Sequence, residues 1–507
     1  MSLATLIKRL QDIMRMDNGI SGDGQRLEQI VWMIFLKVFD YKEEEAELDD
    51  DYEPIIPEGY RWRDWAVGTS AKEQLTGKEL LDFVNNRLIP VLSGEAILDE
   101  NGNHVVLFEK NDKRSLLVKE IMSDAENHMK NGYKLREVIN LFNEVDFEDS
   151  GEAHAFNDMY ETLLKGLQAA GTMGEFYTNR AITSFAIEHV NPRLGGTLAD
   201  WAAGTGGFLI DALEYMQKQV SDGDLDGQRS LQKSVRGGEY KPLPYQLNVT
   251  NLLLHGIEAP NIRYGDSLNE KNFNDYTSND LVDYCALNPP YGGTALPEDL
   301  ASFPSDMRSS ETADLFVALA VKRLKENGRG VIVLPDGFLF GNDAAKTNIK
   351  KYLMNECNLH TIIRLPQSCF APYTSIATNL LFFDKGLKTK ETWVYRLDLV
   401  NGQKFSKSRN PMKREHFNCV DEWWKNRVEI MDEKDDESVA TTYKAKKFTY
   451  EEIESDGFNL DRCGYPVKEK VILSPEETMQ DFIARREALE KKMDEKLAII
   501  KSLLEVK

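Results

Sequence analysis

The alternation of short apolar strands with helical segments between residues 171 and 395 most constrains the fold of this chain. The runs that predict strands are rich in β-branched residues: GTLADWAAG, VRGGEY, IRYGDS, VDYCALNPP, GRGVIVLPD, LHTIIRLP and SIATNLLFFDKG. Strands that alternate with helices predict an α/β fold with an open, mainly parallel, doubly wound sheet. Ligands bind such sheets at the carboxyl ends of the strands, near the switch in strand order, so a site is expected there.

The chain has 507 residues, too many for one ordinary core, and its patterning predicts four parts. Residues 1–150 predict an N-terminal helical domain, because apolar residues recur there at three- and four-residue spacing. Residues 151–395 hold the predicted sheet. Residues 396–470 form a charged extension with little apolar content for a core, and residues 471–507 predict a helical tail.

Within the helical domain, the periodic segments are 3–15, 25–41, 115–131 and 134–145, and the Pro- and Trp-rich stretch 52–66 predicts a packed connector. The tail is expected to begin at Ser474 and Pro475, with Glu477 at the capping-box position. Its apolar seam consists of Leu489, Met493, Leu497, Ile500 and Leu504. This seam favours packing against a helix of a partner subunit, and folding back onto its own domain is the alternative.

The tetrapeptide Asn288-Pro289-Pro290-Tyr291 follows the apolar run VDYCAL and predicts a site for a planar amino group. The prolines fix φ and lack amide donors, so their carbonyls and the Asn288 side-chain oxygen can face one point beyond the strand. Two acceptors directed at an exocyclic amine draw its lone pair out of conjugation, and the Tyr291 ring offers a stacking face. Alone, the tetrapeptide would indicate only a proline-stiffened loop.

Three further strand ends favour a nucleoside-type methyl donor beside that amine. The glycine-rich turn ADWAAGTGGF at 199–208 lets the backbone approach a ligand closely, and it lacks the GxGxxG and GK[ST] orders that cradle phosphates. Glu239, which closes VRGGEY, is placed to accept both hydroxyls of a ribose. Asp266, in IRYGDSL, is placed to accept from an adenine amino group.

In order, GEFYTNR at 174–180, DWAAGTGGFL, GGEY, GDSL and NPPY resemble the motifs of amino-type DNA methyltransferases in the gamma arrangement. With the helical first domain and FNLDRCGY at 458–465, nearly the whole chain resembles the modification (M, methylase) subunit of type I restriction-modification systems. The resemblance implies a Rossmann-like S-adenosylmethionine-dependent methyltransferase sheet. Asn288 at the start of the tetrapeptide implies that the 6-amino group of adenine is the target.

The resemblance also implies the site residues. S-adenosylmethionine is expected to contact Gly174, Glu175, Phe176, Tyr177, Thr178, Asn179, Asp200, Ala202, Ala203, Gly204, Thr205, Gly206, Glu239 and Asp266. The catalytic residues are expected to be Asn288, Pro289, Pro290 and Tyr291, with the adenine flipped out of duplex DNA. The family commonly has Pro, Cys and Pro where this chain has Trp201, Ala203 and Asn179, so we expect altered donor affinity rather than loss of activity.

Charge and chain length predict that the chain depends on partners. The net charge of −22 disfavours DNA binding by this chain alone. Acidic clusters lie at 43–53 and 431–437, and the basic stretch 404–415 predicts either a phosphate contact or a solvated loop. The residues after the last predicted strand, near Asp384, are too few for a target-recognition domain plus the tail. The expected partners are therefore duplex DNA, a specificity (S) subunit, a second methylase subunit and a restriction (R) subunit.

The five cysteines are scattered, without a CxxC pair or a His cluster, so no metal site is expected, and Cys285 and Cys369 are expected in the core. No apolar run reaches the length of a membrane span and no signal-peptide core is present, which predicts a cytoplasmic protein. Two other functions remain open. Protein glutamine methylation would leave the first 150 residues and the tail unexplained, and the intact motif set argues against a noncatalytic assembly subunit.

Overall fold

The computed structural model of the chain describes residues 3–68, 74–99, 101–144, 178–370, 376–399, 402–406, 410–432 and 442–465, with Thr374 and scattered positions from 479 to 496. The chain divides into two compact units, Met1–Gly464 and Tyr465–Lys507. The expected tail start at Ser474, and every residue of the expected tail seam except Met493, lie outside the described residues. No helix in the described ranges has both the length and the apolar run needed to cross a membrane.

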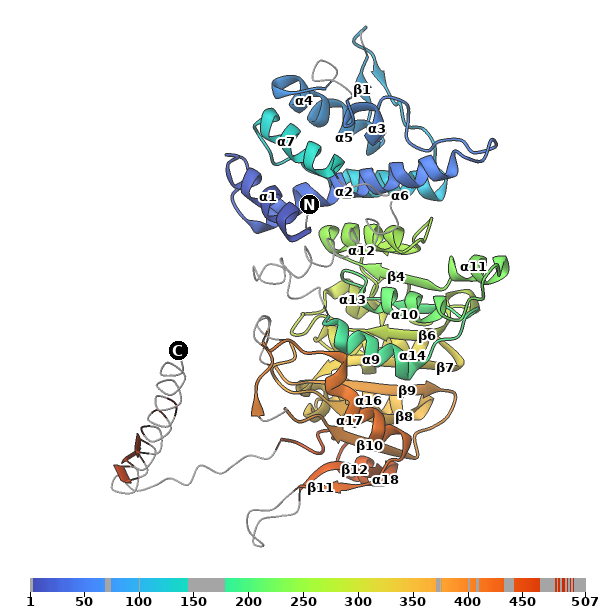
Figure 1. Ribbon diagram of the computed structural model, residues 1–507. Coiled ribbons are helices and arrows are strands. Elements are labelled where there is room, and N and C mark those ends of the chain that lie inside the picture. The colour runs from blue at the N-terminus through green and yellow to red at the C-terminus, as the bar shows by residue number, and fades with distance from the viewer. Residues whose placement is uncertain are drawn as a thin grey trace. The chain divides into compact units, whose positions relative to one another are not determined.

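Residues 3–144 form a mainly helical region, drawn in blue to cyan in Figure 1. Its elements are α1 (Leu3–Arg15), α2 (Asp23–Ala46), α3 (Trp62–Trp65), α4 (Gly77–Phe83), a π-helical turn (Val84–Leu88), α5 (Ile89–Leu92), the hairpin strands β1 (Ile97–Leu98) and β2 (His104–Val105), α6 (Lys113–Ser123) and α7 (Gly132–Asn143). The helices expected at 3–15, 25–41 and 134–145 are confirmed, and the hairpin is an addition. The connector at 52–66 is packed, with Ile56, Trp62 and Trp65 all buried.

The prediction of one helix over residues 115–131 is wrong beyond Ser123, where α6 ends. The Asp17 carboxylate accepts hydrogen bonds from the backbone amides of Lys130 (3.0 Å) and Asn131 (2.9 Å). Asp17 is 3% exposed, so this carboxylate replaces water as the partner of those amides. The side chain of Asn131 then accepts from the amides of Tyr133 and Lys134 and starts α7 as a new helix.

Ten strands of the described residues form one sheet, in the order β11-β12-β10-β8-β9-β7-β6-β3-β4-β5. Their bounds are β3 (Leu198–Asp200), β4 (Val235–Glu239), β5 (Ile262–Tyr264), β6 (Val282–Leu287), β7 (Leu324–Pro335), β8 (Cys357–Arg364), β9 (Thr378–Lys385), β10 (Glu391–Arg396), β11 (Ile430–Met431) and β12 (Tyr443–Thr449). All seven expected strands are present. The chain runs outward from β3 through β4 to β5 and then returns to β6 on the other side of β3, so the switch in strand order lies between β3 and β6.

In the described residues the sheet is parallel from β5 to β7 and mixed beyond β7. Five of its nine strand pairs are parallel, which confirms the expectation of a mainly parallel sheet. Strand β9 pairs antiparallel with both β7 and β8, and β10 is parallel to β8. The outermost pairs, β10 with β12 and β12 with β11, are antiparallel.

Helices cover both faces of the sheet, as the expected doubly wound fold requires (Figure 1). The connecting helices are α9 (Arg180–Val190), α10 (Gly207–Gln217), α11 (Leu225–Leu231), α12 (Pro242–Leu254), α13 (Pro297–Ser302), α14 (Thr312–Arg323), α15 (Asp336–Phe340) and α16 (Ala344–Glu356). Side chains alternate between two cores, because successive residues of a strand face opposite sides. Val331 and Val333 share a core with α9, α10 and α12, whereas Ile332 and Leu334 share one with α14 and α16.

The expectation that the sheet ends near Asp384, and that residues 396–470 lack apolar core residues, is wrong. Strands β10, β11 and β12 extend the sheet beyond Asp384, and α17 (Asn418–Lys425) and α18 (Tyr450–Ser455) pack on it. The extension buries Phe417, Trp423 and Phe458 in the two cores. The segment at 458–465 is held by buried arginines, because Arg364 donates to the Arg462 carbonyl (2.8 Å) and Arg396 donates to the Gly464 carbonyl (2.7 Å).

Candidate active site

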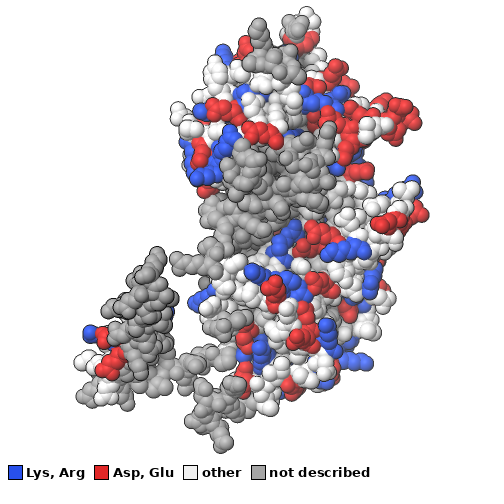
Figure 2. Space-filling view, in the orientation of Figure 1, with Lys and Arg blue, Asp and Glu red and all other residues white. Residues whose placement is uncertain are grey.

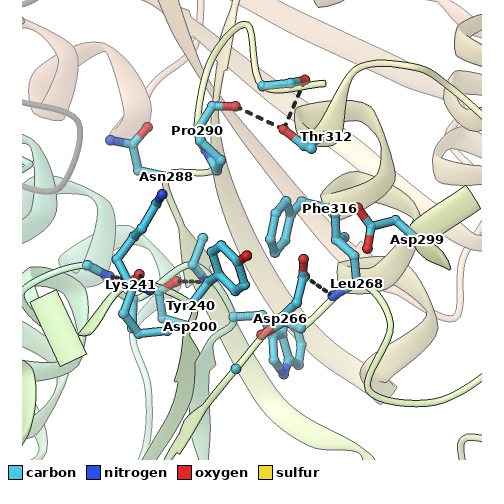
Figure 3. Close-up of a pocket in the computed structure, with 18 of the residues that line it drawn as sticks. Asp200, Tyr240, Lys241, Asp266, Leu268, Asn288, Pro290, Asp299, Thr312 and Phe316 are labelled. Carbon is cyan, nitrogen blue, oxygen red and sulfur yellow. Dashed lines mark hydrogen bonds between the residues drawn. The ribbon is translucent and has the colours of Figure 1, made fainter. Parts of the chain in front are cut away.

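A pocket of about 350 Å³ opens at the carboxyl ends of β3, β4, β5 and β6, beside the switch in strand order. In Figure 3, Asn288 and Pro290 lie on the opposite side of the pocket from Asp200 and Asp266. The volume is in the range of small-molecule sites. The four strand ends that the sequence singled out therefore meet in one place.

The glycine-rich turn after β3 brings main chain to the pocket wall. Gly204 and Gly206 have φ angles of +52° and +85°, a region that side-chain-bearing residues rarely adopt. Gly206 is the N-cap residue of α10, and its missing Cβ would stand 2.5 Å from the Asn248 side-chain oxygen of α12. Another residue of α12, Asn251, donates to the Thr205 carbonyl (3.3 Å). Contacts from α12 thus hold the turn in place. From Ala202 to Gly204 it presents only backbone and small side chains to a ligand, while Trp201 and Phe208 also line the pocket.

Two buried carboxyl groups hold the ends of β3 and β4. One Asp200 oxygen accepts from the Ala202 amide (2.9 Å), whereas the two Glu239 oxygens accept from the amides of Gly204 (2.7 Å) and Lys241 (2.8 Å). Burial raises the pKa of Asp200 well above its usual value, and the charge of Glu239 adds to this effect. Burial also raises the pKa of Glu239, against the lowering effect of its amide donors. Each Glu239 oxygen is already engaged once, so a ribose hydroxyl would be a second donor to it.

Asp266 lies half-buried at the end of β5, with one oxygen accepting from the Leu268 amide (2.8 Å). Burial raises the pKa of Asp266, and the nearby Asp299 charge raises it further. Asp299 is 1% exposed and accepts from the Leu296 amide (2.8 Å) and the Asn269 side chain (3.0 Å). Together with Asp200 and Glu239, these acids give the pocket wall a strongly acceptor character.

The Asn288 side chain is held at both of its ends. Its Nδ2 donates to the Thr178 hydroxyl (3.0 Å), and its Oδ1 accepts from the Tyr291 hydroxyl. Burial raises the pKa of Tyr291, which keeps the phenol protonated and able to donate. The Tyr291 ring meets Phe370 edge to face at 6.3 Å between centroids. The oxygen that was expected to face a substrate amine is therefore engaged by a neighbouring side chain.

Of the fourteen expected site residues that the structure describes, nine line the pocket. Those that line it are Thr178, Asp200, Ala202, Ala203, Gly204, Glu239, Asp266, Asn288 and Pro290. Those that lie behind or beside it are Asn179, Thr205, Gly206, Pro289 and Tyr291. The side chain of Asn179 caps α9 by accepting from the Ala181 amide. Gly174, Glu175, Phe176 and Tyr177 lie outside the described residues.

Sequence reasoning missed several lining residues, among them Tyr240, Lys241, Leu268, Thr312 and Phe316. Tyr240 and Leu268 stand one and two residues after the expected strand-end acids, so their position was a usable signal. Thr312 and Phe316 come from α14, where apolar residues cover nearly the whole circumference and no periodic face points to a site. Trp201, noted as a departure from the family pattern, is buried in the wall under the Arg323 guanidinium (4.9 Å to the ring centroid).

The strand order, the carboxyl-edge pocket and the tetrapeptide after β6 define the fold class of S-adenosylmethionine-dependent methyltransferases. Comparison with known sequences narrows this class. Residues 151–471 match the family described as N-6 DNA Methylase, and residues 3–142 match the HsdM N-terminal domain. The chain therefore belongs to the N-6 DNA methylase family, as a methylase subunit of the type I restriction-modification kind.

Relatives that match nearly the whole chain support this family assignment. The EcoEI type I restriction enzyme methylase subunit of Escherichia coli is 44% identical over 95% of this chain and 94% of its own length. A solved structure described as the modification subunit of a type I restriction enzyme from Vibrio vulnificus YJ016 is 36% identical, with a TM-score of 0.74 over 91% of this chain and 96% of that one. A chain from a study of type I R-M complex assembly is 31% identical, with a TM-score of 0.76 over 99% of this chain and 98% of its own.

These matches establish the enzyme class as an adenine-specific DNA methyltransferase. The same matches argue against the two other functions that the sequence left open. A protein glutamine methyltransferase would not explain the match over residues 3–142, and a noncatalytic assembly subunit does not fit the match to methylases over 151–471.

Proposed function

We propose that the pocket at the ends of β3 to β6 binds S-adenosylmethionine and that the chain transfers its methyl group to the 6-amino nitrogen of an adenine flipped out of duplex DNA. The observation that carries the proposal is the meeting of the glycine turn, the strand-end acids and Asn288 around one cavity. When bound, the donor supplies a methyl group on a positively charged sulfur. The acceptor-rich wall suits such a cation, and the left-handed Gly204 permits close main-chain approach.

The donor contacts follow from the groups that remain available. Glu239 keeps lone pairs for the ribose hydroxyls, and Asp266 keeps one carboxyl oxygen for the adenine amino group. Tyr240 is 54% exposed at the pocket mouth and offers its ring to an adenine face. Residues 174–177, whose structure is not described, remain donor contacts by family resemblance alone.

Catalysis on this site is mainly positioning and polarisation. The Asn288 oxygen and the Pro289 carbonyl would accept the two amine hydrogens, turning the nitrogen lone pair toward the donor. Thr178 would fix the orientation of the Asn288 amide by accepting from its Nδ2. The Asn288 oxygen has a second lone pair for the substrate amine. The Tyr291 hydroxyl would leave this oxygen when the ring moves to stack on the base.

Partners are expected from charge as well as from family. Figure 2 shows acidic side chains gathered at and beyond the C-terminal end of α2, where Glu44, Glu45 and Asp49 to Asp51 are exposed. In the basic stretch 404–415, Arg414 is already paired with Glu188 and Asp421. We therefore assign most of the DNA binding to other subunits, namely a specificity subunit, a second methylase subunit and a restriction subunit. The complex would act in the cytoplasm, where the DNA is.

The donor assignment is tested by calorimetric titration of the purified chain with S-adenosylmethionine. Gly204→Val places a β-branched residue at φ +52° and should abolish measurable binding, whereas Gly223→Ala, a left-handed surface glycine with no atom near its missing Cβ, should bind normally. Normal binding of S-adenosylmethionine by Gly204→Val would refute the assignment of this pocket as the donor site. The reaction is tested by mapping methylated bases in DNA from cells that express the chain with its partner subunits, where only N6-methyladenine is expected.

A further inference from the structure

Thr312, the first residue of α14, occupies an unusual place beside the tetrapeptide. Its hydroxyl lies 3.4 Å from the Pro290 carbonyl oxygen and 3.3 Å from the Gly293 carbonyl oxygen. A hydroxyl has a single proton, so it donates to one of these carbonyls at a time or shares the proton between them. The two carbonyls flank Tyr291 and Gly292, so one side chain holds both ends of the turn that carries Tyr291. Figure 3 shows Thr312 facing Pro290 across the pocket rim.

Backbone pairing holds the same two segments together. The Thr312 amide donates to the Gly293 carbonyl (3.0 Å), and the Ala295 amide donates to the Ser310 carbonyl (2.8 Å). Gly293 is fitted to this contact, because a Cβ there would stand 2.5 Å from the Thr312 hydroxyl oxygen. Gly292 has a φ angle of +69°, so the turn bends next to Tyr291.

The helix end that carries Thr312 is itself anchored in the core. The Ser309 hydroxyl donates to the Asp314 carboxylate (2.5 Å), and Asp314 is fully buried. The Lys346 ammonium, 3% exposed, lies 3.6 Å from Asp314 and 3.2 Å from Glu311. An ion pair placed in the interior holds its backbone rigidly, because moving either partner leaves a buried charge alone. Thr312 therefore stands on a fixed base beside the turn that carries Tyr291.

We propose that Thr312 is a positioning residue for methyl transfer: its hydroxyl holds the Pro290 and Gly293 carbonyls in place while Tyr291 leaves Asn288. This inference rests on the proposed function and adds a residue to it. With both ends of the turn tied, the Tyr291 ring can swing toward the base without displacing Asn288 and Pro289. Without the hydrogen bonds of the Thr312 hydroxyl, the same movement would carry the Asn288 oxygen and the Pro289 carbonyl away from their positions.

The test compares variants of the complex purified with its specificity subunit, in single-turnover methylation of duplex DNA at saturating donor. Thr312→Val keeps the shape and removes the proton, and its rate constant should fall about two- to tenfold, the range expected for one neutral hydrogen bond. Thr312→Ser keeps the hydroxyl and should restore a rate near that of the wild type. Gly293→Ala, which pushes on the hydroxyl, should slow transfer as Thr312→Val does.

Donor affinity and DNA affinity should stay within about twofold in Thr312→Val, because the tie acts on a movement that follows binding. The matched control is Thr392→Val in β10, which also deletes a buried hydroxyl that donates to a carbonyl (Leu359, 2.7 Å) and should leave the rate unchanged. A wild-type rate in Thr312→Val, no rescue by Thr312→Ser, or an equal loss in Thr392→Val would each overturn the inference. A wild-type complex that does not methylate adenine would instead refute the proposed function.

Discussion

Replacing Tyr291 with Phe should speed methyl transfer rather than slow it. The substitution removes only the hydroxyl that donates to Asn288 Oδ1 and keeps the ring with its edge-to-face contact to Phe370. A neutral hydrogen bond contributes about 0.5–1.5 kcal/mol. If that bond has to break before the Tyr291 ring can move to stack on the base, its loss should raise the single-turnover rate about two- to tenfold.

The companion variant Tyr291→Ala also frees Asn288 but loses the stacking face, which is worth about 1–3 kcal/mol for an aromatic ring on a base. Its rate should therefore fall below that of the wild type while Tyr291→Phe rises above it. The assay is transfer of a labelled methyl group to duplex DNA by the assembled complex, with the donor saturating. If Tyr291→Phe is slowed as much as Tyr291→Ala, the hydroxyl acts in the transition state and the release step is wrong.

Three other outcomes are expected. Donor affinity measured by titration should weaken as pH falls toward the raised pKa of Glu239, because a protonated carboxyl accepts fewer hydroxyls; pH-independent affinity would contradict this. The pKa of Asp314 rises from 3.8 unfolded to about 6 folded, so stability is lost as pH increases through that window, roughly 3 kcal/mol in all. Urea unfolding of Asp314→Asn should lack that loss. Truncation before Ser474 should preserve donor binding but abolish co-purification with the specificity subunit, unless the tail folds on its own domain.

The sequence predicted the strands of the sheet where apolar runs were bounded by turn residues, and it failed where they were not. Strand β12 reads YKAKKFT, so only Ala445 is fully buried and lysines dominate its composition. A strand of this kind, second from the edge of the sheet, owes its place to backbone pairing with β10 and β11, which no hydrophobic pattern records. The charged extension was therefore interpreted as lying outside the sheet.

Some residues of the candidate site could be predicted from the sequence and others could not. Asp200, Glu239 and Asp266 were predictable, because parallel strands place their carboxyl ends at one edge and an acid there is visible in sequence. Thr312 was not, because its relation to Pro290 depends on how α14 packs. The bond from Tyr291 to Asn288 was also beyond prediction, since it depends on a side-chain rotamer and the residue types are the same with or without it.

The shortness of the outer strands bears on what happens when many copies of the chain crowd together. In the described part of the chain, the sheet ends in β11, with two residues, and in β5, with three. Exposed strand edges are templates on which other chains can add, and long flat edges are the most hazardous. Edges of two and three residues offer an incoming strand only a few hydrogen bonds. The short edges therefore disfavour edge-to-edge aggregation of this ten-stranded sheet when the protein is concentrated.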